Sequence, residues 1–149
     1  MPNIATVHRR EGVTDMRYML LVLPKGYETA PPGAVPDATL VERMTKFNES
    51  LSKAGVLLAL EGLHPPATGS RVRFAGGKPM VVDGPFAEAK EVVGGYWLLQ
   101  VKSKEEAVEW AKRAPMPDGD VIEVRRVQEL ADFPPDVQRA AGSIRLGPQ

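Results

Sequence analysis

Apolar residues along the chain follow two periodicities, one typical of β-strands and one typical of α-helices. Apolar or alternating runs predict strands over residues 18–23, 56–60, 71–74, 79–82, 96–101 and 121–127. Apolar residues recur every three or four positions after Asp37 and after Ser103, which predicts two helices. The order is therefore strand, helix, strand, hairpin, strand, helix, strand. Two βαβ units separated by a hairpin describe an α+β, ferredoxin-like fold with an antiparallel sheet.

Capping residues mark the ends of both predicted helices. Asp37 is an N-cap residue, and Gly55 is a C′ residue that ends the first helix. Ser103 begins a capping box for the second helix, and Pro115 ends it. The buried stripe of the first helix is expected to consist of Leu40, Met44, Phe47 and Leu51. That of the second is expected to consist of Ala107, Trp110, Ala111 and Ala114.

The strands at residues 18–23 and 96–101 are apolar on both faces. Tyr18, Leu20 and Val22 point to one face, and the residues between them are also apolar. Two helices cover only one face of the sheet, so the second face needs another cover. The simplest cover is a second copy of the chain, and we therefore expect a homodimer.

The hairpin around Gly76-Gly77 has two possible registers. A two-residue turn places Asp83 on the same face as Val72 and Phe74. A three-residue turn places Asp83 on the face of Arg71 and Arg73 instead. The three-residue turn gives the cleaner alternation of apolar and polar residues, and it is the register we predict.

Residues 81–91 combine a strand end with a stiff corner and read Val-Val-Asp-Gly-Pro-Phe-Ala-Glu-Ala-Lys-Glu. Pro85 fixes its own φ, and Asp83 is placed to accept bonds from the following amides, as in an Asx-turn. This stretch, with Gly94-Gly95-Tyr96-Trp97 after it, resembles the signature of the YCII-related family in its DGPF-domain branch. Further matching pieces are Met16-Arg17-Tyr18-Met19, Gly62-Leu63-His64-Pro65, and Glu105-Glu106-Ala107 with Trp110-Ala111.

The resemblance covers Met16 to about Glu129. It implies the dimeric α/β-barrel superfamily, in which two sheets pack face to face. In other members of that superfamily, a histidine on the first helix pairs with an aspartate, which implies acid–base chemistry. Residues 44–48 are Met, Thr, Lys, Phe and Asn here, so the helix histidine is not carried over.

Composition and charge limit the classes of function. The 149-residue chain has 19 basic and 19 acidic side chains, which argues against broad binding to nucleic acid or to an anionic membrane. It has no cysteine and only two histidines, His8 and His64, and its glycine pairs lack phosphate-loop contexts. We expect no metal site and no cofactor. No apolar run reaches membrane-spanning length and residues 1–15 lack a signal-peptide core, so a cytoplasmic protein is expected.

Three segments are predicted along the chain. Residues 1–15 are polar and aperiodic, which indicates a disordered N-terminal extension, an expression scar or a start codon assigned too early. Residues 16–130 form the folded domain. Residues 131–149 are expected to be a C-terminal arm lying on the surface.

Two loops carry the candidate acid–base residues. His64 can act as a general acid or base, or be a loop histidine bonded to a backbone carbonyl. Asp83 can orient His64 or simply hold the corner, and Glu88 is either a second acid or a solvated surface charge. We predict that Asp83 and His64 wall a small polar pocket, because both lie next to proline at strand ends.

Arg71 and Arg73 share one strand face and are candidates for binding a small carboxylate or phosphate. The alternative is that they only form the solvent-exposed face of the hairpin. The pattern therefore favours a small anionic or polar ligand. The first hypothesis for function is a small-molecule enzyme with lyase- or isomerase-like acid–base chemistry. The alternatives are a non-catalytic ligand-sensing or partner-binding module, and a scaffold in which the corner at Asp83 is purely structural.

Overall fold

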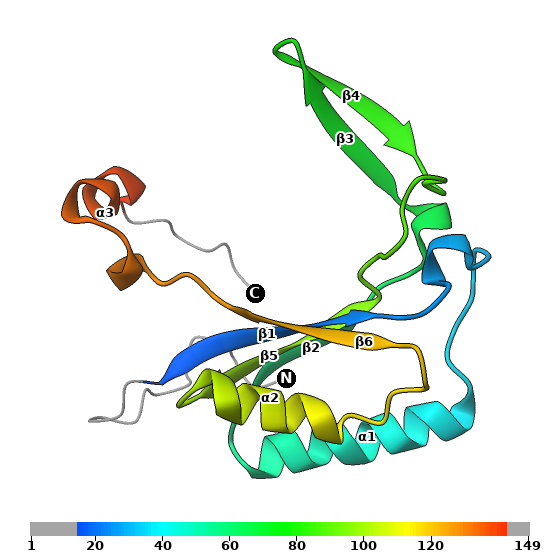
Figure 1. Cartoon of the computed structure of the whole chain (residues 1–149), viewed down its shortest axis with the longest axis horizontal. Helices are drawn as coiled ribbons and strands as arrows, with labels where there is room; N and C mark the ends of the chain where they lie inside the picture. Colours follow the sequence, from blue (N-terminus) through cyan, green and yellow to red (C-terminus); the bar gives the residue numbers. More distant parts are fainter. Residues whose placement is uncertain (1–14, 143–149) are drawn as a thin grey trace.

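A four-stranded antiparallel sheet with strand order β2-β5-β1-β6 forms the centre of the computed structural model, which describes residues 15–142 (Figure 1). The sheet strands are β1 (Met16–Leu23), β2 (Leu57–Gly62), β5 (Gly95–Val101) and β6 (Val121–Arg126). The hairpin strands are β3 (Ser70–Ala75) and β4 (Lys78–Asp83), and the helices are α1 (Ala38–Lys53), α2 (Lys104–Arg113) and α3 (Pro135–Ala141). This order and connectivity confirm the ferredoxin-like α+β fold.

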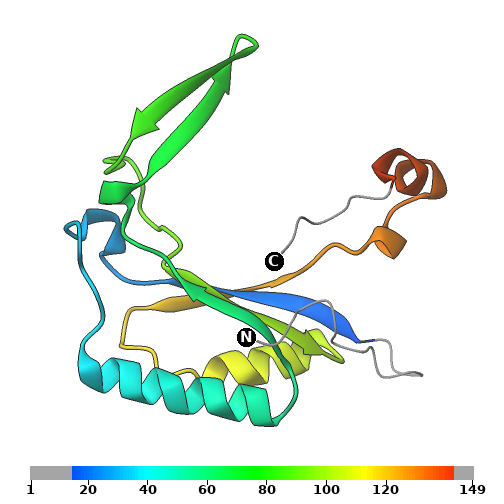
Figure 2. The ribbon, with the colours of Figure 1, turned by 180° about the vertical axis from the view of Figure 1, so that it is seen from behind.

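Helices α1 and α2 both cover the same face of the sheet (Figures 1 and 2). The core between them contains every second residue of β1 and β5, so strand alternation is obeyed. Its most deeply buried members are Leu20, Leu51, Leu99 and Val101. On the other face, Met19, Leu21, Leu23 and Leu98 are only half-buried.

The predicted helix caps are confirmed. The side chain of Asp37 accepts a hydrogen bond from the backbone N–H of Leu40 at 2.8 Å, and Ser103 accepts one from Glu106 at 3.1 Å. In the predicted capping box of α2, the Glu106 carboxylate accepts a hydrogen bond from the backbone N–H of Lys102 rather than from that of Ser103. Gly55 has a positive φ of 73°, as a residue just past a helix end requires.

Replacement of Asp37 by alanine is expected to destabilise the protein by about 1 kcal/mol, because the first turn of α1 loses the acceptor for an N–H. Asp37→Asn keeps a side-chain oxygen and is expected to retain most of that stability. Urea denaturation of the two variants measures the difference. Equal midpoints for Asp37→Ala and Asp37→Asn would show that the cap contributes nothing.

The predicted register of the β3–β4 hairpin is wrong. Ala75 pairs with Lys78, which leaves a two-residue turn of Gly76 and Gly77, and Ser70 pairs with Asp83. Both glycines have positive φ, 58° and 76°, as a type I′ turn demands. Asp83 therefore lies on the face of Val72 and Phe74, not on that of the two arginines. The hairpin projects from the body, and all its side chains except Arg71 are exposed (Figure 1).

The part of the C-terminal arm within the described residues, up to residue 142, extends away from the sheet. It continues from β6 through a short turn at Leu130–Asp132 into α3, away from the sheet (Figures 1 and 2). Its beginning is fixed by Arg17, which makes two bonds to the carboxylate of Glu129 at 2.6 and 3.1 Å. The prediction of a disordered extension at residues 1–15 falls outside the described residues, apart from residue 15.

Candidate functional site

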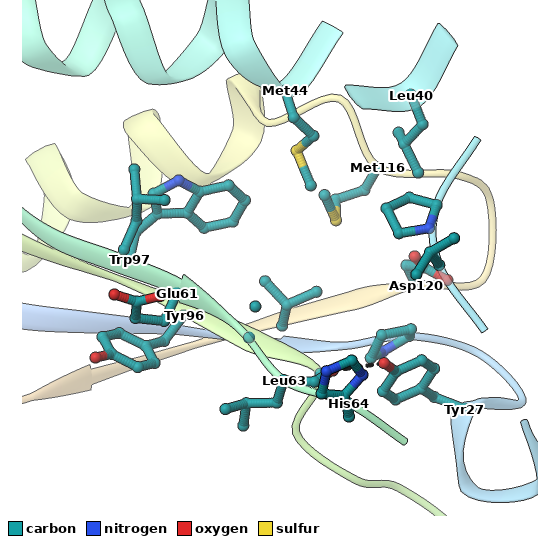
Figure 3. Close-up of a pocket in the computed structure, with 18 of the residues that line it drawn as sticks. Tyr27, Leu40, Met44, Glu61, Leu63, His64, Tyr96, Trp97, Met116 and Asp120 are labelled. Carbon is teal, nitrogen blue, oxygen red and sulfur yellow. Dashed lines mark hydrogen bonds between the residues drawn. The ribbon is translucent and has the colours of Figure 1, made fainter. Parts of the chain in front are cut away.

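A cavity of about 570 Å³ lies where β2 and β5 end, next to α1 (Figure 3). Its size falls in the range typical of sites for small organic ligands. The chain segments around it are the ends of β2 and β5, the loop before α1, α1 itself and the loop between α2 and β6. These segments are far apart in the sequence, so the cavity is a product of the fold.

A cross-strand pair of glycines leaves the space for this cavity. Gly62 of β2 lies opposite Gly95 of β5, one pair beyond Glu61 and Tyr96. A Cβ at Gly62 would meet no atom within 4 Å, whereas one at Gly95 would lie 2.7 Å from the backbone oxygen of Glu61. The sheet is thus too tight for a side chain at Gly95 and open at Gly62.

The wall facing the helices is apolar. Leu40 and Met44 of α1, Met116 and Trp97 line it (Figure 3). Trp97 is held firmly, because its indole N–H donates to Asn48 Oδ1 at 2.8 Å and its ring meets Phe47 edge-on at 5.2 Å. Helix α1 contributes only Leu40, Met44 and Asn48 to the wall and thus no titratable group. The predicted buried stripe of α1 is therefore split, with Phe47 and Leu51 in the core and the first two residues at the cavity.

Polar groups gather at the ends of the cavity. Tyr27 and His64 lie at one end (Figure 3), where the Tyr27 hydroxyl donates to the backbone carbonyl of Leu63 at 2.5 Å. Asp120 lies near them, and its Oδ1 accepts from the backbone N–H of Lys25 at 2.9 Å. Glu61 also lines the cavity and is exposed.

The phenol of Tyr27 is expected to titrate later than an exposed tyrosine. Burial raises its pKa above the ordinary value of 10.0, because the phenolate would lose hydration. The folded protein therefore favours the protonated phenol of Tyr27 over the phenolate. The contribution of the protonated phenol to the free energy of unfolding is fully present below the unfolded pKa and is lost as pH rises through the folded pKa. Ultraviolet absorbance titration of wild type and Tyr27→Phe measures this. The variant should lose a late-titrating phenol, and an unchanged high-pH limb would contradict the prediction.

Of the predicted site residues, His64 lines the cavity and the other four do not. Asp83 accepts a bond from the Ser70 hydroxyl at 2.6 Å. Within residues 15–142, no bond joins it to His64, and no following backbone amide donates to it as an Asx-turn would require. Asp83 therefore does not wall the cavity that His64 lines.

The two candidate arginines do not line this cavity. The Arg71 guanidinium lies over the ring of Phe86, 4.1 Å from its centroid, and Arg73 bonds to Glu88 at 2.6 Å. The Arg73–Glu88 pair is well exposed, so it contributes little to stability. In the described structure both arginines contact the segment that follows the hairpin, Arg71 at Phe86 and Arg73 at Glu88.

The two loops that carry His64 and Asp83 nevertheless meet through their backbones. The N–H of Gly84 donates to the carbonyl of Gly69 at 2.8 Å, in the turn that follows Pro66. A Cβ at Gly84 would lie 1.7 Å from the carbonyl oxygen of Pro66. The Gly84–Pro85 bond is cis, and Phe86 is buried as the predicted anchor of the corner.

Sequence reasoning missed most of the cavity wall. Tyr27 and Asp120 line the cavity, and neither is among the residues predicted from the sequence. Gly94 and Gly95 were interpreted as part of the family signature and as a glycine pair without a phosphate-loop context, not as cavity residues. The pairing of Gly62 with Gly95 was the available signal, and it becomes visible only once the strand register is known.

Between residues 15 and 142, no group of three or more His, Asp or Glu side chains is placed to hold a metal ion. In the same range, no helix has the length and apolar character needed to cross a membrane.

Comparison with known proteins gives one family and one relative. The model of the YCII-related domain matches residues 16–131, more than half of the chain. An uncharacterized protein of Rhizobium meliloti (strain 1021), R00369, is 30% identical over 76 residues. That match covers 51% of this chain and 61% of the relative, so less than two thirds of the relative's length is spanned.

Proposed function

Because the chain belongs to the YCII-related domain family, we propose that it binds a small organic molecule in the cavity between β2, β5 and α1. The observation that carries the proposal is the cavity itself, an apolar space with polar groups only at its ends. Ligand sites commonly combine an apolar lining with a few polar groups that fix orientation. Gly62 supports the same reading, because a side chain there would enter open space and yet the residue is glycine.

Acid–base chemistry on the bound molecule is the enzymatic form of this proposal. His64 is its acid–base group, because it is the histidine that lines the cavity and imidazole exchanges protons near neutral pH. Asp83 and Glu88 are left out of this role, since their carboxylates bond to Ser70 and Arg73. The alternative is a binding module without catalysis, favoured by the absence of a described acid that bonds to His64.

The proposal is tested by filling the cavity. The neutral dye N-phenyl-1-naphthylamine is expected to bind the wild type at one site per chain, with a saturable rise in dye fluorescence. Gly62→Leu is expected to abolish this signal while keeping the fold, since its Cβ meets no atom within 4 Å. Equal dye binding by Gly62→Leu and wild type would exclude this cavity as the site.

A control is needed because the hairpin also offers apolar surface to a dye. Phe74 is 81% exposed near its tip. Phe74→Thr is expected to leave the saturable signal unchanged, because Phe74 does not line the cavity.

A separate NMR experiment tests whether His64 belongs to the site. Addition of the dye should shift the His64 imidazole resonances, which are identified by their loss in His64→Gln. An unshifted His64 would remove it from the site.

We also propose that the protein is a homodimer through the sheet face opposite α1 and α2. The support is the second apolar face of β1 and β5, which carries the half-buried Leu21 and Leu98, while α1 and α2 both cover the other face of the sheet. A stable interface of this kind buries roughly 1,200–2,000 Å² in total. Leu21→Arg is expected to give a folded monomer in light scattering.

The matched control for the dimer is Val41→Arg. Val41 is an exposed apolar residue of α1, 45% accessible, and α1 covers the sheet face opposite the proposed interface. The Val41→Arg variant should remain dimeric at the same protein concentration. A wild-type monomer at micromolar concentration would refute the dimer.

A further inference from the structure

Charge is distributed unevenly around the cavity. Its wall residues include two carboxylates, Glu61 and Asp120, and neither a lysine nor an arginine. His64 is the remaining titratable group besides the two tyrosines. The chain as a whole has equal numbers of acidic and basic side chains, so the bias belongs to the site. An anion placed here would lie beside like charges, whereas a cation would be attracted.

Of the two carboxylates, Asp120 is the better placed to bind a cation in the cavity. Its backbone N–H donates to Pro117, and its Oδ1 accepts from the N–H of Lys25, so two bonds fix the position of the residue. Within residues 15–142, its Oδ2 accepts no hydrogen bond and no ion pair neutralises it. The stem of Lys25 packs against the same turn, where a Cβ at Gly119 would lie 2.7 Å from Lys25 Cδ. The turn therefore presents a fixed carboxylate oxygen at the cavity.

The apolar wall suits the rest of such a ligand. Trp97 offers an aromatic ring, against which a flat apolar body can stack. Met44 and Met116 offer polarizable, adaptable side chains that fit aromatic or branched bodies. Figure 3 shows Met44, Met116 and Trp97 on the helix side of the cavity, with Asp120 at one end.

We infer that the ligand is a protonated amine with an apolar body, whose ammonium group lies at Asp120 and whose body lies against Trp97, Met44 and Met116. This inference rests on the proposed function, since it assigns the chemical class of the molecule bound in the same cavity. It takes the opposite charge from the ligand predicted from Arg71 and Arg73, because neither arginine lines the cavity. The remaining lone pair of the Tyr27 hydroxyl is a further acceptor for an ammonium group.

A series of ligands that share one ring system isolates the effect of charge. 1-Naphthylmethylamine, 1-naphthalenemethanol and 1-naphthoate are a cation, a neutral molecule and an anion of nearly equal size. Calorimetry at pH 7 and low salt should rank them in that order of affinity. The amine is expected to bind roughly five-fold more tightly than the alcohol, as for a partly exposed charge pair, and its advantage should shrink with added salt.

Asp120→Asn is the key variant. Asparagine keeps an oxygen for the N–H of Lys25, so the turn is expected to persist while the charge is lost. The amine and the alcohol should then bind with nearly equal affinity. Glu61→Gln should reduce the preference less, because Glu61 is exposed. An undiminished preference for the amine in Asp120→Asn would overturn the assignment to Asp120.

The outcomes separate this inference from the proposed function. Binding of the neutral dye together with naphthoate affinity equal to or above that of the amine would overturn the amine assignment and leave the cavity as the ligand site. Binding of neither the dye nor any member of the series would refute the proposed function itself. A ranking of amine, alcohol and acid that collapses in Asp120→Asn would support both.

Discussion

Replacement of Gly84 by alanine is expected to destabilise the protein by about 1–3 kcal/mol or more, the range for forcing an extra group into a packed site. The added methyl would lie 1.7 Å from the carbonyl oxygen of Pro66 and 2.7 Å from its carbonyl carbon. Both atoms are backbone, so neither can rotate away as a flexible side chain could. The corner must then lift from the turn at residues 66–69 and lose the 2.8 Å bond from Gly84 to Gly69. Urea denaturation measures the loss.

Gly69→Ala is the matched control for Gly84→Ala. Gly69 lies in the same turn with an extended backbone, φ −103° and ψ 179°, and its Cβ would lie 3.5 Å from the Pro66 oxygen. That distance is ordinary contact, so a change within about 0.5 kcal/mol is expected. Equal stabilities of the two alanine variants would show that the corner does not approach Pro66 this closely.

Local signals are what made the fold predictable. The helix caps at Asp37 and Ser103 depend on residues only three positions away, and both were identified correctly. The strands were recognised because each buries one row of side chains, and the βαβ order then left few topologies. The strand ends were less well placed, since β2 runs from Leu57 to Gly62 and the sequence predicts a strand over residues 56–60.

The hairpin shows where the apolar pattern misleads. Alternation favoured a register that gathers the apolar residues of both strands on one face, which is the correct rule for a sheet packed on a core. The β3–β4 hairpin packs on no described core, and Val72 and Val81 are 50% and 70% exposed. Turn geometry decides the register instead, and two glycines with positive φ select the two-residue turn.

The candidate site was only partly predictable because its wall is assembled from distant segments. His64 was identified from its place beside a strand end, and it does line the cavity. Asp83 was equally prominent in the sequence, but its carboxylate bonds to Ser70. Tyr27 and Asp120 carry no local signal, because the loops that hold them acquire a shared surface only when the sheet forms. Side-chain direction in loops is information that only the fold supplies.

Trp97→Ala is expected to cost about 3–5 kcal/mol, the largest loss among the variants considered. The indole is 4% exposed, at the centre of the core between the sheet and α1. Its removal leaves a void beside Phe47, whose ring it meets at 86°. It also leaves Asn48 Oδ1 without the donor at 2.8 Å that it has in the native protein. Denaturant midpoints measure the loss, and the cavity should lose its dye affinity with it.

Trp97→Phe separates the hydrogen bond from the packing. It keeps an aromatic ring beside Phe47 but removes the donor to Asn48, so a loss of about 1–3 kcal/mol is expected. Trp110→Phe is the matched control, because Trp110 is also buried at 9% exposure but its indole makes no hydrogen bond within residues 15–142. Its loss should be the smaller of the two, since no partner is left unpaired. A double variant Trp97→Phe with Asn48→Ala should be less destabilised than the sum of the two single changes. Strict additivity would show that Asn48 and Trp97 stabilise the fold independently, and the hydrogen bond would then not be what holds the indole at the cavity wall.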